Sequence, residues 1–381
     1  MSRITACLIP MLCASAALVP SSVAKATTAP VAYVYVSRTN PDFIDALAAS
    51  PAGALTYIND VSTPHPLIHL SVTKKFVFGI DGKSNIYSYS IAANGGLKYV
   101  ASIDAAKYVK DASSTSSAPV LQVDETGSDV YAFVTDTNNN WYLLSFKIES
   151  NGELEFLGSA YANSYFSEIR FVQDNKYALY PSCDITVLRL GTESKVNAQT
   201  MVYKRESNGL LSYIGASDVE PEAQGPYQYC PDVSENDTTD HLAVSFALID
   251  PTHNEFVGSA VGTYTVSATG KLTTTSNWEN MPTVGYTPAV VSISPSSNIL
   301  AVGGSGSYQF FHFNGANPIT AYSGVINAGD QVRAFSWDKS NHAYMLTGSA
   351  VVPFSITTTS YKALTPYSIS APYSMIVLSL Q

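Results

Sequence analysis

The sequence predicts an all-β fold: a seven-bladed β-propeller of four-stranded antiparallel blades, with the ring closed by the C-terminal strand. Three observations predict it. A short turn followed by an aliphatic residue recurs along the chain about every 50 residues, the size of one propeller blade. Alternating runs rich in β-branched and aromatic residues flank these turns. The chain also ends on a strand that lacks the rest of its blade.

The turns are the clearest repeat. Asn94-Gly95 and Asn208-Gly209 each stand between two strand-like runs, and this pair is a strong hairpin marker because both residues accept positive φ. The aliphatic residues that follow the seven turns are Leu55, Leu97, Leu154, Leu211, Leu272, Ile319 and Leu364.

Each repeat contains four strand-like runs. A proline opens the first run of several repeats, as in 66–72, 119–123 and 288–293. The first repeat lacks this inner run, and the C-terminal run 372–380 has its pattern, so we expect the last strand to complete the first blade. The predicted blades are 32–63 with 371–381, 64–110, 117–162, 165–219, 222–281, 286–325 and 330–369.

The N-terminus is predicted to be an export signal, residues 1–26. Arg3 precedes an apolar stretch, and Ala24-Lys25-Ala26 matches a small-residue cleavage site. We therefore expect residues 27–381 to form a single propeller domain that is periplasmic or secreted. Two cysteines remain in it, Cys183 and Cys230; a disulfide is one interpretation, and two buried free thiols are the favoured one.

Composition excludes several classes of protein. The 381 residues are 46% hydrophobic and 11% aromatic, which is too apolar for a disordered chain. The net charge of −10 argues against nucleic-acid binding. No later run approaches the roughly 20 apolar residues of a membrane span. No phosphate-binding, dinucleotide or metal-ligand motif is present, so we expect no cofactor and no metal, and we expect a monomer.

These inner-strand and turn patterns resemble those of the lactonase-type seven-bladed propellers, which include one class of bacterial 6-phosphogluconolactonase and the fungal carboxymuconate-lactonising enzyme. The resemblance covers essentially all of 27–381 and implies the propeller fold. At four polar positions of the family's presumed active site the chain departs from it. Gly225-Pro226-Tyr227-Gln228 stands where Gly-Pro-Arg-His is usual, 165–170 lacks a histidine, 244–248 lacks a glutamate, and 303–306 lacks Asn-Arg.

These departures bear on function. Opening a lactone needs a base or an activated water and a donor for the oxyanion, and losing one such group costs on the order of 10²–10³ in rate. We therefore favour a binding propeller that has lost the family's catalytic residues, with an unknown small molecule or protein at the channel mouth, and we assign no catalytic residue. The alternative is a lactone hydrolase with a rearranged site, and a lesser one is an adhesion or surface-layer propeller. His, Arg and Glu side chains that converge in the channel would favour the lactone hydrolase, whereas Tyr, Ser and Asp side chains there would favour the binding propeller.

The candidate binding residues are polar groups near strand ends. Four aspartates follow second strands and could bind a cation or a basic partner, although aspartate is also an ordinary turn residue. Two arginines near inner-strand starts could hold an anion or pair locally. His65 and His69 are four apart, roughly 13 Å on a strand, too far for one metal. The candidates are Asp81, Asp136, Asp184, Asp250, Arg170, Arg333, Tyr227, Gln228 and His65.

Overall fold

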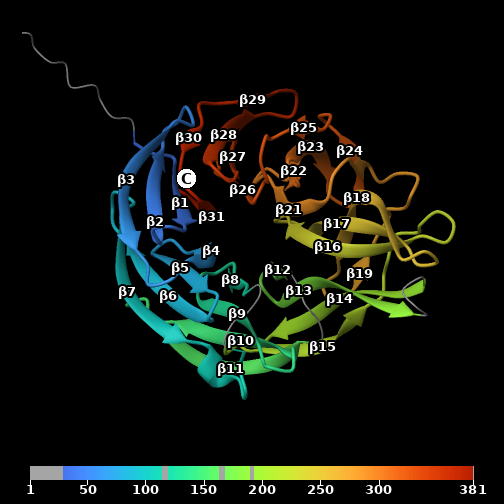
Figure 1. Cartoon of the computed structure of the whole chain (residues 1–381), viewed down its shortest axis with the longest axis horizontal. Helices are drawn as coiled ribbons and strands as arrows, with labels where there is room; N and C mark the ends of the chain where they lie inside the picture. Colours follow the sequence, from blue (N-terminus) through green and yellow to red (C-terminus); the bar gives the residue numbers. More distant parts are fainter. Residues whose placement is uncertain (1–28, 114–118, 163–167, 189–192, 381) are drawn as a thin grey trace, which may run out of the picture.

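The computed structural model describes residues 29–113, 119–162, 168–188 and 193–380; the predicted export signal lies outside this part of the chain. These residues form seven antiparallel sheets arranged in a ring (Figure 1), which confirms the predicted fold class. In six of the sheets the strand that comes first in the chain lies nearest the centre, and in the seventh sheet the C-terminal strand takes this place. No helix in the described part of the chain is long and apolar enough to cross a membrane.

Blades 2 to 4 are each built from four consecutive strands. Blade 2 contains β4 (Leu67–Val72), β5 (Phe76–Asp81), β6 (Asn85–Ile91) and β7 (Leu97–Asp104). Blade 3 contains β8 (Leu121–Val123), β9 (Asp129–Thr135), β10 (Trp141–Ile148) and β11 (Leu154–Ala162). Blade 4 contains β12 (Arg170–Val172), β13 (Tyr177–Leu188), β14 (Glu193–Arg205) and β15 (Leu211–Ser217). A 3-10 turn, η1 (Ala106–Tyr108), follows β7.

Blades 5 to 7 differ because their outer edge consists of two short strands that both pair with the third strand. Blade 5 contains β16 (Gln228–Asn236), β17 (His241–Asp250), β18 (Glu255–Val266), β19 (Leu272–Thr273) and β20 (Thr283–Val284). Blade 6 contains β21 (Pro288–Ile293), β22 (Ile299–Gly304), β23 (Ser307–Asn314), β24 (Asn317–Ala321) and β25 (Ile326–Asn327). Blade 7 contains β26 (Ala334–Trp337), β27 (His342–Leu346), β28 (Ala350–Ile356), β29 (Tyr361–Ala363) and β30 (Tyr367–Ser368).

Blade 1 joins the two ends of the chain. It contains β1 (Ala32–Arg38), β2 (Phe43–Ala49), β3 (Leu55–Ser62) and the last strand, β31 (Pro372–Ser379). β31 pairs antiparallel with β1 from Ala32 opposite Ser379 to Ser37 opposite Ser374. The predicted ring closure is therefore confirmed.

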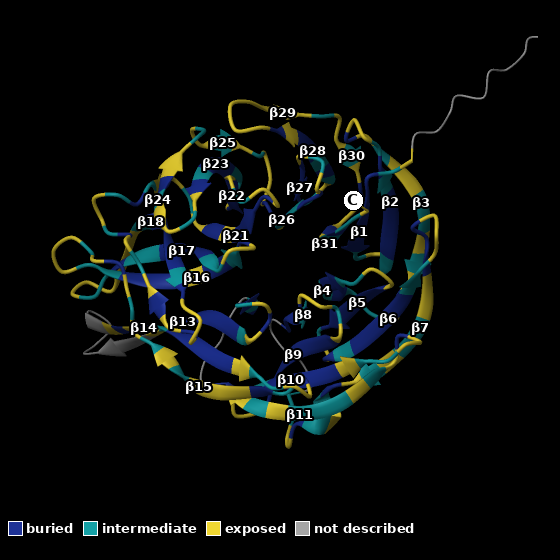
Figure 2. Cartoon of the chain, turned by 180° about the vertical axis from the view of Figure 1, so that it is seen from behind, coloured by how far each residue is buried: buried dark blue, intermediate teal, exposed yellow. Residues whose placement is uncertain are grey.

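The core lies between the blades. Figure 2 shows the middle strands buried and the rim exposed. Between blades 3 and 4, the ring of Tyr131 lies 5.0 Å from that of Phe171, and Phe133 meets Tyr180 edge-on at 6.0 Å. Aromatic side chains bury about 150–250 Å² each, so ring contacts of this kind hold one blade against the next.

The recurrent Asn-Gly turns also serve this packing. Gly95 has φ of 86°, and a Cβ added there would lie 2.3 Å from the ring of Tyr33 in the preceding blade. The hydroxyl of Tyr35 donates to the carbonyl of Gly95 at 3.1 Å. Glycine therefore permits both the turn and the close approach of the neighbouring tyrosine.

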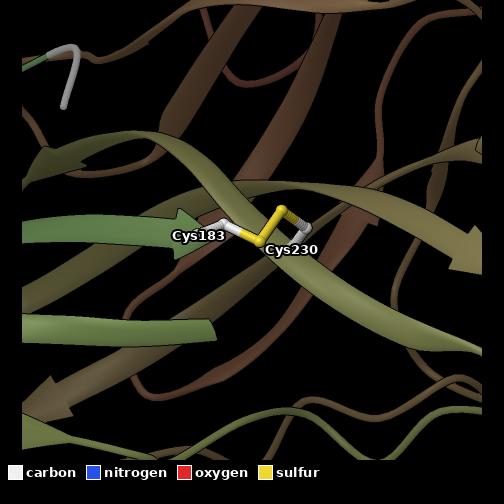
Figure 3. The surroundings of a disulfide bond; sticks show 2 residues. All are labelled: Cys183 and Cys230. Atoms are coloured by element: carbon white, nitrogen blue, oxygen red, sulfur yellow. A yellow bond between two sulfur atoms is a disulfide. The ribbon is translucent and has the colours of Figure 1, made fainter. Parts of the chain in front are cut away.

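Cys183 of β13 and Cys230 of β16 form a disulfide between blades 4 and 5, with their Cα atoms 5.4 Å apart (Figure 3). The favoured interpretation of two free thiols is therefore wrong. The pairing depends on the distance between strands of neighbouring blades, which the sequence does not contain.

Candidate functional site

A cavity of about 500 Å³ lies in the central channel. All seven innermost strands, or the residues just before them, contribute to its lining. Because the blades are related by rotation about the channel, these strands run in the same direction, and their first residues surround the same mouth. Polar lining residues are His69, Ser71, Gln122, Glu168, Arg170, Glu235, Ser292, Gln331, Arg333, Ser336, Tyr373 and Ser374.

The wall formed by blades 4 and 5 carries a cluster of paired charges. Arg170 begins β12, and its Nη2 contacts the carboxylate of Glu168, two residues earlier. The same Nη2 lies 3.2 Å from the carboxylate of Glu235 on β16. The Nε of Arg170 donates to the carbonyl of Ser234 at 2.6 Å. One guanidinium thus joins two blades and neutralises part of the charge of two glutamates.

Burial changes the protonation of these glutamates. It raises the pKa of Glu168 to about 7, with Arg170 opposing the rise and the charges of Glu235 and Asp232 adding to it. Burial also raises the pKa of Glu235, again opposed by Arg170. Near neutral pH the Glu168 carboxyl can therefore either accept or donate a proton.

His69 reaches the same channel from β4. Burial lowers the pKa of His69 to about 4, and the charge of Arg170 adds to this shift, so the imidazole is neutral at neutral pH. The imidazole ring of His69 forms a hydrogen bond with the backbone of Leu121. Its buried Nδ1 has no hydrogen-bond partner in the described part of the chain. A neutral imidazole with one free nitrogen can bind a ligand or exchange a proton with it.

The opposite wall, formed by blades 7 and 1, carries an unpaired cation. Arg333 immediately precedes β26 and is exposed to the channel, with its guanidinium carbon 5.5 Å from the ring centre of Tyr373 on β31. Among the residues that the structure describes, no carboxylate lies within ion-pair distance of Arg333. This guanidinium is therefore available to an anion.

Three of the predicted aspartates close their own turns. Asp81 accepts hydrogen bonds from the backbone N–H groups of Lys83 and Asn85, both at 2.8 Å. Asp136 accepts hydrogen bonds from the backbone N–H groups of Asn138 and Asn140. Asp250 accepts hydrogen bonds from those of Thr252 and His253. Asp184 is exposed on the long strand β13. The structure does not bring these four carboxylates together on the cavity, and their role as cation ligands stays a prediction.

The remaining predicted residues also lie outside the cavity lining, except for the two arginines. Tyr227 and Gln228 stand at the start of β16, before the disulfide. The Nε2 of His65 lies 3.3 Å from the Nζ of Lys83. In the described ranges, no group of three or more His, Cys, Asp or Glu side chains could hold a metal ion.

Three of the residues that build the site escaped the sequence analysis as site residues: His69, Glu168 and Glu235. His69 lies in the proline-led run 66–72, so projecting every inner run onto a common channel would have found it. Glu235 lies beyond an irregularity in β16, which hides its register.

A second cavity, of about 480 Å³, lies over turns of blades 2 and 3. Its buried carboxylate, Asp124, accepts from Thr126, from Asn175 and from two backbone N–H groups, and lies 3.3 Å from Arg205. This carboxylate is already satisfied within the fold, so the channel is the better candidate site.

The ring is a seven-bladed β-propeller, and solved propellers described as lactonases are similar to it. A Pseudomonas aeruginosa periplasmic gluconolactonase is similar, with a TM-score of 0.65 and 10% identity over 92% of this chain and 99% of that one. A putative 6-phosphogluconolactonase from Bacteroides fragilis has a TM-score of 0.60 and 12% identity, over 91% and 98%. A Lactobacillus plantarum protein has a TM-score of 0.62 and 14% identity, over 92% and 100%. No sequence profile of a protein family and no curated protein sequence matches this chain.

Proposed function

We propose that this protein is an exported propeller that binds a small hydroxylated anion in its central channel, such as a sugar acid. The observation that carries the proposal is the asymmetry of the channel. Arg333 on one wall has no carboxylate partner among the described residues, whereas Glu168 and Glu235 on the other wall present carboxyl oxygens.

The chemistry of the two walls fits such a ligand. A guanidinium binds a carboxylate or phosphate through two parallel hydrogen bonds, and the face of Tyr373 beside it offers an apolar surface. Glu168, Glu235 and Gln122 can accept or donate hydrogen bonds to hydroxyl groups. Gluconate, the product expected of a gluconolactonase, is therefore the probe that we choose.

Export and loss of the family chemistry are parts of this proposal. Export is supported by the predicted signal at residues 1–26 and by the fold similarity to a protein described as periplasmic. Loss of the family chemistry is supported by the four departures from the family pattern, among them Tyr227 and Gln228 in place of Arg and His.

A second candidate is a lactone hydrolase with a rearranged site, and the convergence of His69, Glu168 and Arg170 favours it. In such a reaction His69 or the ionised Glu168 would take a proton from water while the water oxygen bonds to the lactone carbonyl carbon. The bond from that carbon to the ring oxygen would then break, and the proton would pass to the ring oxygen. Arg333 would stabilise the developing oxyanion.

The test uses the purified mature protein, residues 27–381. Calorimetry with sodium gluconate measures binding, and a pH-indicator assay with glucono-δ-lactone measures turnover against buffer alone. We expect gluconate to bind and Arg333→Ala to weaken its affinity by about 10-fold or more, the loss of a charge-assisted contact. Lys362→Ala, which removes an exposed cation on β29, is the matched control and should bind as the wild type does.

The outcomes separate the candidates. Turnover well above the buffer rate would support the hydrolase and overturn the loss of chemistry. If the protein shows no gluconate binding and no lactone turnover, both candidates are overturned.

A further inference from the structure

The only two cysteines in the described part of the chain lie beside the charged wall of the channel. Cys230 is in β16, four residues before Ser234, whose carbonyl accepts from Arg170. Glu235, the next residue, forms the ion pair with the same arginine. The disulfide therefore links β16, which supplies the contacts of blade 5 to Arg170, to β13 of blade 4. β13 pairs with β12, the strand that begins with Arg170.

The pairing of β16 with its own sheet is interrupted between these points. Its pairing with β17 shifts register between Pro231 and Ser234, and Pro231 has no N–H to donate to the ladder. In this interval the Val233 N–H donates to the hydroxyl of Ser245 at 3.1 Å. The ladder resumes with Ser234 opposite Val244 and Glu235 opposite Ala243, and a further restraint on the bulge before them comes from outside the sheet.

The disulfide supplies that restraint from the neighbouring blade. Around it lies a small apolar cluster formed by Val196, Ala198, Cys230 and Ile249, with Cys183 and Ala247 packed against it. This cluster is separate from the larger core between blades 4 and 5. The contact between the two blades at this level therefore depends on few apolar residues and on one covalent bond.

We propose that Cys183 and Cys230 are positioning residues, whose disulfide holds β16 against β13 so that Ser234 and Glu235 reach Arg170. Breaking the bond lets β16 withdraw, and Glu235 moves away from Arg170 and Glu168. The consequence for ligand binding rests on the proposed function, whereas the positioning can be tested on the protein without ligand.

The test is the titration of Glu168, followed by carboxylate NMR of protein with labelled glutamate and assigned with Glu168→Gln. The charged groups around it are Arg170 on its own segment, and Glu235 and Asp232 on β16, while His69 faces Arg170 from β4. In the oxidised wild type we expect a midpoint near 7. In the double variant Cys183→Ser, Cys230→Ser the midpoint should fall by roughly half a unit or more, because Glu168 loses the repulsion of Glu235 and keeps Arg170.

Two comparisons keep the test decisive. Val196→Ala removes apolar contact from the same cluster but leaves the disulfide, so it should lower Tm without moving the Glu168 midpoint. If the double variant fails to fold, the same titration is measured on folded wild-type protein whose disulfide has been reduced by a phosphine. The disulfide then gains two electrons and two protons to give two thiols, and the phosphine takes oxygen from water to become its oxide. Reoxidation should restore the original midpoint.

An unchanged Glu168 midpoint after loss of the bridge, with near-UV circular dichroism retained, would overturn the proposal. Gluconate calorimetry on the same samples should show weaker binding without the bridge. If gluconate binds neither form while the midpoint still moves, the proposed function fails and the positioning role stands.

Discussion

The two walls of the channel use arginine in different ways. On the wall of blades 4 and 5, Arg170 is largely buried and contacts two glutamates and a backbone carbonyl. On the wall of blades 7 and 1, Arg333 is exposed and lies beside the face of Tyr373. The charges of the first wall satisfy one another and hold blades together, whereas the charge of the second wall is the one that the proposed function assigns to a ligand.

The largest effect should come from removing the paired arginine. Arg170→Ala leaves two carboxylates close together without their cation, and breaking a buried ion pair costs about 3 kcal/mol or more of the free energy of unfolding. Urea denaturation of the variant measures this loss. Arg333→Ala, from the opposite wall, should change the same quantity by about 0.5 kcal/mol or less. Equal losses in the two variants would erase the distinction between the walls.

The stability of the protein should also depend on pH through the wall of blades 4 and 5. The pKa of Glu168 is raised from an ordinary value of 4.5 to about 7, so between these values the folded state holds a proton that the unfolded state has lost. The contribution of this carboxyl to stability therefore declines as pH rises from 4.5 to about 7. Glu168→Gln should remove that decline, and urea midpoints across pH 4.5–8 measure it. Glu279→Gln, at an exposed site, should keep the wild-type profile; a profile unchanged by Glu168→Gln contradicts the prediction.

The smallest effect concerns the ring beside the free arginine. Tyr373→Leu removes a contact between a cation and an aromatic face, worth about 0.5–1 kcal/mol at an exposed site, and should weaken gluconate binding by about 2- to 5-fold. Calorimetry provides the measurement, with Tyr373→Phe as the control that keeps the ring. A phenylalanine variant as weak as the leucine variant would assign the effect to the tyrosine hydroxyl instead.

The fold could be predicted from the sequence because its determinants are local and repeated. The glycine of a turn such as Asn94-Gly95 and the alternation of the runs around it act over a few residues, and each copy reinforces the others. Ring closure followed from one missing strand at the start and one surplus strand at the end.

The site was harder to predict because it depends on distances between blades. Arg170 and Arg333 could be placed near the channel because both lie near the starts of inner strands. The partners of Arg170 could not be placed, because Glu235 follows a shift in the register between β16 and β17. The disulfide could not be predicted for a similar reason, because it depends on how far the long strands β13 and β16 extend and how closely they approach each other.

The pairing of β31 with β1 has a consequence for biosynthesis. β1 leaves the ribosome before every other described strand, and its inner-edge partner leaves after all of them. At about 5–20 residues per second, the unpaired edge of β1 waits roughly 20–70 s for that partner. During this interval an exposed strand edge can pair with another chain. Any chain interrupted before Pro372 keeps that seven-residue edge open, whatever the state of the other six blades.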